Sequence, residues 1–288
     1  MAAVVDRTPF ELPRAVASDV EVFAIGDIHG RADLLQALLD EAAREPRLRP
    51  RRAIVFLGDL VDRGPDSLGV IDLALGARER IGADEQICLM GNHEAMMRLA
   101  LDPGSPWDDA LDALEVWLRN GGGEVVRQFA EFAARPAGPE ALLTVLRVAL
   151  PERVRAWLEG LKSHWRSGDV LFVHAGVNPH VPLDAFLATP WDTPLARLDE
   201  DRHWAWVRWP FLEFQPGPAG FSGLFVTHGH TPNDASPNPS HARQIARFRL
   251  NLDAGSGATG RAKMAIFRGR EAKVLTAVGP TNRMLRDG

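Results

Sequence analysis

The chain has 288 residues, of which 45% are hydrophobic and 25% charged, a balance that is ordinary for a globular protein. Its formal net charge of −5 argues against a general nucleic-acid binder, which would carry a basic excess. The sequence contains no secretory signal at its start and no apolar run long enough to span a membrane, so we expect a cytoplasmic protein without membrane attachment.

The first part of the chain alternates short apolar runs with helical patterns. Residues 20–25, 53–57 and 86–90 are apolar runs that end at turn residues, as strands buried on both faces do. Between them, residues 33–39 and 66–75 carry apolar side chains at helical spacing. This alternation favours βαβ units and a largely parallel sheet, and hence an α/β fold.

The stretch at residues 94–161 differs, because it is rich in Ala, Leu, Arg and Glu and is interrupted by prolines and three consecutive glycines. We interpret it as an inserted segment of several helices. Further strands are expected after it, at residues 170–173, 224–226, 248–252, 264–267 and 272–278. Residues 231–240 contain three prolines and are expected to form a loop.

Polar side chains that can bind metals follow five of the expected strands. They are Asp27-Ile28-His29, Asp59-Leu60-Val61-Asp62, Asn92-His93-Glu94, His174 and His228-Gly229-His230. Ligand groups in open α/β sheets gather beyond the carboxyl ends of the strands, so we expect one shared site. Mixed carboxylate, imidazole and amide ligands suit manganese, iron or zinc, and the absence of cysteine ligands suggests a catalytic pair of ions rather than a structural zinc.

The same motifs, in this order and spacing, resemble the signature of the phosphoprotein phosphatase family within the calcineurin-like metallophosphoesterases. The matching segments are Gly26-Asp27-Ile28-His29-Gly30, Gly58-Asp59-Leu60-Val61-Asp62-Arg63-Gly64, Gly91-Asn92-His93-Glu94, His174-Ala175-Gly176 and Gly229-His230-Thr231-Pro232. A further segment, residues 206–212, resembles one found in bacterial members.

The resemblance covers roughly residues 20–275 and implies a fold of two mixed β-sheets sandwiched between helices. We therefore expect a single metallophosphoesterase domain at residues 20–280 that contains the helical insertion. An N-terminal extension, residues 1–19, would precede the domain, and a tail, residues 281–288, would follow it.

The resemblance also implies a ligand set for two divalent ions, with manganese expected and iron or zinc as alternatives. One ion would be held by Asp27, His29 and the bridging Asp59, and the second by Asp59, Asn92, His174 and His230. The neighbouring His228 precedes the glycine of its motif and is interpreted as structural or as a support for a ligand. For Asp253 the sequence leaves open a role at the site or in a turn.

Four further residues carry the expected chemistry, in which a metal-bridging hydroxide attacks phosphorus directly. By resemblance, His93 protonates the leaving group and Asp62 orients it. Arg63 binds the phosphoryl oxygens, and Arg208 supplies a second guanidinium.

Three functions remain open at this point. The leading one is a protein phosphatase acting on phosphoserine or phosphothreonine, with phosphotyrosine not excluded, because Asp62-Arg63 and Glu94 match that class. The second is a symmetrical dinucleoside tetraphosphate hydrolase, whose related motifs commonly carry Ala-Arg and Gly-Asn-His-Asp. The third is an inactive phosphate-binding scaffold. Trp204, Trp206 and Trp209 are interpreted mainly as core, with a substrate rim as the alternative. The oligomeric state is not determined by the sequence.

Overall fold

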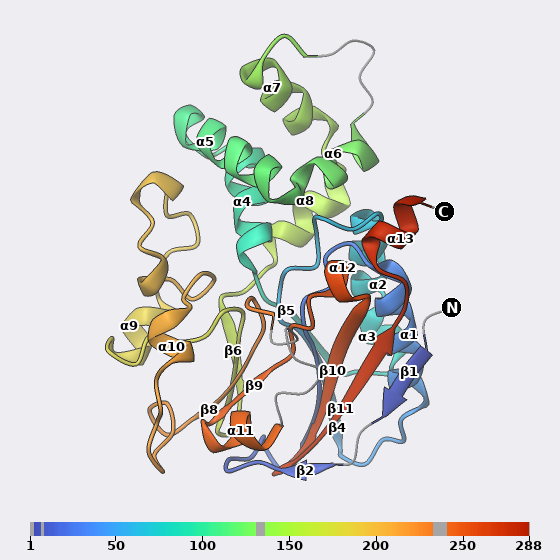
Figure 1. Cartoon of the computed structure of the whole chain (residues 1–288), viewed down its shortest axis with the longest axis vertical. Helices are drawn as coiled ribbons and strands as arrows, with labels where there is room; N and C mark the ends of the chain where they lie inside the picture. The colour runs from blue at the N-terminus through green and yellow to red at the C-terminus, as the bar shows by residue number, and fades with distance from the viewer. Residues whose placement is uncertain (1–2, 7–8, 131–135, 233–240, 288) are drawn as a thin grey trace.

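The computed structural model describes residues 3–6, 9–130, 136–232 and 241–287. The loop expected at residues 231–240 lies outside the described residues from residue 233 onward. Two mixed β-sheets form the centre of the molecule, and helices pack around them (Figure 1). No helix in the described part of the chain has the length and apolar character needed to cross a membrane.

The first sheet contains the parallel unit that the sequence predicts. Its strands, in spatial order, are β1 (Ala3–Asp6), β11 (Glu271–Val278), β10 (Arg261–Arg268), β3 (Val20–Ile25), β4 (Arg51–Phe56) and β5 (Glu85–Cys88), and β2 (Phe10–Glu11) also pairs with β11. Strands β3, β4 and β5 are parallel, whereas β10, β11 and β1 run antiparallel to their neighbours. The expectation of a largely parallel sheet is therefore wrong for β10, β11 and β1, because a two-residue turn between β10 and β11 can join only antiparallel strands. The first sheet is mixed, as the resemblance implies.

The residues before β3 add two short strands to the edge of this sheet. Both strands lie in the segment that the sequence indicates only as an extension, and both pair with β11. They have only four and two residues, too few for an alternating pattern to stand out.

The second sheet has the order β6 (His164–Ser167), β7 (Val170–Val173), β8 (Phe225–His228) and β9 (Arg249–Asn251). Strands β7, β8 and β9 are parallel, and β6 forms an antiparallel hairpin with β7. Phe172 of β7 contacts Phe267 of β10 edge to face, with 5.4 Å between ring centroids. The two sheets therefore pack against each other.

Helices on the outer side of the first sheet follow the predicted pattern. Helix α1 (Ala32–Arg44) buries the apolar stripe that contains Leu34 and Leu38 and packs against β10 and β11. Helix α2 (Ser67–Leu75) lies beside α1, and α3 (Ala77–Arg80) packs against β4 and β5. The remaining short helices are α9 (Leu183–Leu187), η2 (Leu195–Arg197), η3 (Glu200–Arg202), α10 (Trp209–Leu212), α11 (His241–Ala246), α12 (Ser256–Thr259) and α13 (Asn282–Asp287).

The helices expected at residues 94–161 are present between β5 and β6. They are α4 (Asn92–Leu101), α5 (Trp107–Trp117), the π-helical turn η1 (Leu118–Gly122), α6 (Gly123–Phe129), α7 (Pro139–Ala149) and α8 (Glu152–Glu159). Figure 1 shows them, in green, stacked beyond one end of the sheets. We refer to this segment as the helical insertion.

Candidate metal centre

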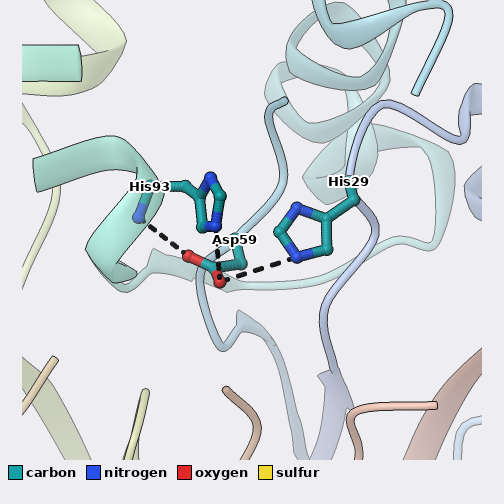
Figure 2. A group of neighbouring side chains, drawn as sticks. All are labelled: His29, Asp59 and His93. Carbon is teal, nitrogen blue, oxygen red and sulfur yellow. Dashed lines mark hydrogen bonds and ion pairs between the residues drawn. The ribbon is translucent and has the colours of Figure 1, made fainter. Parts of the chain in front are cut away.

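Asp59 lies at the centre of the predicted site, in the loop after β4. Its Oδ2 is 3.7 Å from Nε2 of His29 and 4.0 Å from Nε2 of His93 (Figure 2). Its Oδ1 is 3.4 Å from Nε2 of His174, which follows β7. The loops after strands of both sheets therefore meet at this carboxylate.

Two groups of buried side chains around Asp59 could each hold a metal ion. One contains His29, Asp59 and His93, and the other contains Asp59, His174 and His230. Within each group the candidate ligand atoms lie within 4.8 Å of one another. The shared carboxylate is the arrangement expected of a bridging ligand between two neighbouring ions.

Backbone carbonyls fix which imidazole nitrogen faces the centre. Nδ1 of His29 is 2.9 Å from the carbonyl oxygen of Val61, and Nδ1 of His174 is 2.9 Å from that of Leu57. A carbonyl oxygen only accepts, so each Nδ1 donates its proton to that oxygen, and Nε2 is the nitrogen that faces Asp59. This is the tautomer in which histidine binds a metal through Nε2.

His230 and Asn92 provide the observation that fits a metal ion best. Nε2 of His230 is 3.2 Å from the carbonyl oxygen of Trp206 and donates to it, which leaves a lone pair on Nδ1. That Nδ1 lies 2.9 Å from Oδ1 of Asn92, and Nε2 of His174 lies 3.3 Å from the same oxygen. The lone pairs of His230 Nδ1 and Asn92 Oδ1 repel each other at this distance, and a shared cation would remove the repulsion.

The ionised forms of the buried carboxylates around the centre need a nearby positive charge to be stable. Burial raises the pKa of Asp27 well above its usual value, and the carboxylates of Asp253 and Asp59 raise it further. Burial likewise raises the pKa of Asp253 to about 6. Divalent ions would provide the missing charge, so the donor set fits the metals that the sequence predicts.

The open question about Asp253 has a structural answer. Its Oδ1 accepts a hydrogen bond of 2.8 Å from the backbone N–H of Gly255, so it does form a turn. It is also 2% exposed, and its charge acts on Asp27. The structure therefore shows the turn, and a role of Asp253 at the site stays a prediction.

Backbone strain is concentrated at the site. The structure describes seven non-glycine residues with positive φ, and five of them are site residues: His29, Asp59, Asp62, Arg63 and His230, with φ between 48° and 73°. Such conformations cost of order 1–3 kcal/mol each and persist only where their surroundings hold them.

Glu94 helps to keep the loop after β4 in its strained conformation. Its buried carboxylate accepts hydrogen bonds from four backbone N–H groups, those of Gly91, Asp59, Leu60 and Val61, at 2.8–3.2 Å. Burial, more than the nearby charge of Asp59, raises the pKa of Glu94 to about 7. The sequence does not indicate this role of Glu94, because three of its partners precede it by 33–35 residues.

His93, Asp62 and Arg63 form a connected group beside the centre. Nδ1 of His93 lies 2.6 Å from Oδ2 of Asp62, which is fully buried. The guanidinium of Arg63 lies 2.7 Å from Nε2 of His93 and 2.9 Å from Nε2 of His29. An arginine N–H only donates, so Nε2 of His93 is unprotonated in this arrangement, and its Nδ1–H donates to Asp62. Burial lowers the pKa of His93 to about 4, and the charge of Arg63 adds to this effect.

The charge of Arg208 reaches two histidines of the site. Burial lowers the pKa values of His93 and His230, and the positive charge of Arg208 lowers both further.

His228 occupies a different environment from His230. Its ring packs edge-on against Phe211, with 4.8 Å between centroids, and burial lowers its pKa to about 3.

The three tryptophans near Arg208 do not share one environment. Trp204 and Trp206 are 1% and 7% exposed and belong to the core, as their size suggests. Trp209 is 63% exposed, so the substrate-rim interpretation remains available for this residue alone among the three.

Comparison with known proteins supports a phosphoesterase family for this chain. A model of the family described as "Calcineurin-like phosphoesterase" matches residues 20–254. "Serine/threonine-protein phosphatase 1" of Salmonella typhimurium is 37% identical over 114 residues, which are 40% of this chain and 44% of the relative. "Bis(5'-nucleosyl)-tetraphosphatase, symmetrical" of Pseudomonas fluorescens is 28% identical over 159 residues, which are 54% of this chain and 42% of the relative. The chain thus matches less than half the length of either protein.

A solved structure shows the same fold. The cold-active protein-tyrosine phosphatase of a psychrophilic Shewanella superposes with a TM-score of 0.52 at 18% sequence identity. The superposition covers 88% of this chain and 80% of that protein.

Proposed function

Since the chain belongs to the calcineurin-like phosphoesterase family, and is thus a hydrolytic metallophosphatase, we propose that it removes phosphate from serine or threonine side chains of proteins. The observation that carries the proposal is the group of His93, Asp62 and Arg63 beside two candidate ligand groups that share Asp59. A site for binding alone would not need a proton donor with an oriented ring, so this group argues against an inactive scaffold.

Six residues would hold two divalent ions, for which manganese is our first choice, with iron and zinc as alternatives. They are Asp27, His29, Asp59, Asn92, His174 and His230. Two ions bound there would supply Lewis acidity and a water nucleophile at neutral pH. Around them, Glu94 and the backbone carbonyls hold the ligands in place before the substrate arrives.

Residues of the chain itself would bind the phosphoryl group and protonate the leaving group. Arg63 and Arg208 place guanidinium groups near His93, where they would pair with phosphoryl oxygens. When Arg63 turns from the imidazoles to the substrate, Nε2 of His93 becomes free to take a proton from solvent water and to pass it to the departing oxygen. Asp62 accepts from Nδ1–H, and its charge stabilises the imidazolium that this step requires.

A surface groove supports a protein substrate. It has a volume of about 460 Å³ and is lined by Arg63, Arg119, Asn120, Gly121, Glu124, Asn282 and Arg283. Arg63 is exposed at this groove, so a phosphorylated side chain on a protein surface could approach its guanidinium. The motifs Asp62-Arg63 and Glu94 point to the same class. The similarity to a dinucleoside tetraphosphatase keeps that activity as the second candidate.

A comparison of two substrates on one sample tests the proposal. Initial rates are measured with a phosphoserine peptide and with a dinucleoside tetraphosphate, with manganese added and bound metal quantified. We expect a higher kcat/KM for the peptide. A much faster turnover of the nucleotide would transfer the protein to the second class. An absence of turnover on an aryl phosphate, despite full metal occupancy, would favour the scaffold.

A further inference from the structure

One contact links the helical insertion to the proposed proton donor. Trp117, the last residue of α5, is fully buried, and its indole N–H lies 2.8 Å from Oδ1 and 3.0 Å from Oδ2 of Asp62. Asp62 is also fully buried, and its Oδ2 accepts from Nδ1 of His93. The three side chains therefore form a chain that runs from the insertion to the imidazole.

The indole N–H restrains the Asp62 carboxylate. It lies within hydrogen-bond distance of both carboxylate oxygens, and Oδ2 also accepts from Nδ1 of His93. A carboxylate free to rotate would no longer fix the orientation of the ring.

The turn after α5 locks the indole in place. A Cβ atom added at Gly122 would lie 2.5 Å from the ring of Trp117, so the backbone of η1 packs directly on the indole. In the same turn Gly121 has a φ of 112°, and its carbonyl oxygen accepts the backbone N–H of Arg63 at 3.2 Å. The insertion thus contacts both Asp62 and Arg63.

We propose that Trp117 is a positioning residue for catalysis: its indole N–H holds the Asp62 carboxylate so that His93 can protonate the leaving group. The inference rests on the proposed function, because it needs His93 to act as the acid. Trp117 would act through Asp62 and would touch neither the substrate nor the metal ligands. Its effect should therefore be confined to substrates whose leaving oxygen needs a proton.

The test is Trp117→Phe, which retains an aromatic ring but removes the N–H group. On a phosphoserine peptide, whose alkoxide is a poor leaving group, we expect kcat to fall roughly tenfold or more with KM unchanged. On p-nitrophenyl phosphate, whose leaving group needs little protonation, the change should stay below about twofold. Bound metal should equal that of the unmodified protein. Trp157→Phe is the matched control, because Trp157 is 5% exposed in the same insertion and should leave both rates unchanged.

A double substitution separates positioning from general damage. In a His93→Asn background, Trp117→Phe should cause no further loss, because the acid that it serves is already absent. An equal loss on both esters, or a further loss in that background, would overturn the inference. If the phosphopeptide rate falls for His93→Asn but not for Trp117→Phe, the role of Trp117 fails while the proposed function stands. If the unmodified protein hydrolyses no phosphoester, the proposed function itself fails.

A spectroscopic measurement tests the contact without activity and without replacing Trp117. In protein labelled with ¹⁵N at tryptophan, Asp62→Ala should shift one indole N–H resonance and leave the others in place. An indole spectrum that does not respond to Asp62→Ala would contradict the hydrogen bond and the role built on it.

Discussion

Replacing Asp59 with asparagine is expected to lower the rate of phosphoester hydrolysis by roughly a thousandfold or more. The carboxylate lies within 4.0 Å of His29, His93 and His174 and is the one group common to both candidate metal sites. A neutral amide would remove the charge that holds two ions together. Metal assistance contributes several kcal/mol to a transition state, and each step of about 1.4 kcal/mol is a factor of ten in rate.

The measurement is the initial rate on p-nitrophenyl phosphate at saturating manganese. Asp66→Asn is the matched control, because Asp66 lies in the same loop and accepts the N–H of Gly69 at the start of α2. Asparagine caps a helix as well as aspartate does, so this variant should keep its rate. A near-normal rate for Asp59→Asn would remove the two-metal assignment.

Replacing His93 with asparagine is expected to have the second-largest effect, and that effect should depend on the leaving group. The rate on a phosphoserine peptide should fall by about 10²–10⁴-fold, the usual contribution of a general acid. The loss on p-nitrophenyl phosphate should be much smaller. Metal content should stay unchanged, because His93 is hydrogen-bonded to Asp62 and is not in the predicted ligand set.

Rates on the two esters and metal analysis of the same preparation check this prediction. His180→Asn serves as a control for the loss of an imidazole elsewhere, because His180 packs against Phe214. Equal losses on both esters would count against the acid role. Loss of bound metal would instead make His93 a ligand, a role that its place near His29 and Asp59 would permit.

Much of this arrangement could be predicted from the sequence, because its determinants are local. The strands around the site are short apolar runs, and each candidate ligand stands within a few residues of a strand end. Local motifs also favour His230 over His228 as a ligand. In the structure His230 faces Asn92, while His228 packs against Phe211.

The contacts that hold the site together could not be predicted in the same way, because they join residues far apart in the chain. Glu94 holds backbone 33–35 residues before it, and Trp117 reaches an aspartate 55 residues away. Nothing in the sequence around Trp117 distinguishes its N–H from that of any other core indole. Strand β6 was also not predicted, because its residues, His164-Trp165-Arg166-Ser167, do not form an apolar run.

The most direct test of the central claim is a metal titration. Metal-free protein is titrated with manganese, and bound metal per chain is measured together with the rate on p-nitrophenyl phosphate. The account predicts negligible activity without metal and full activity only when two equivalents are bound. Full activity with one equivalent, or activity that survives complete removal of metal, would contradict it.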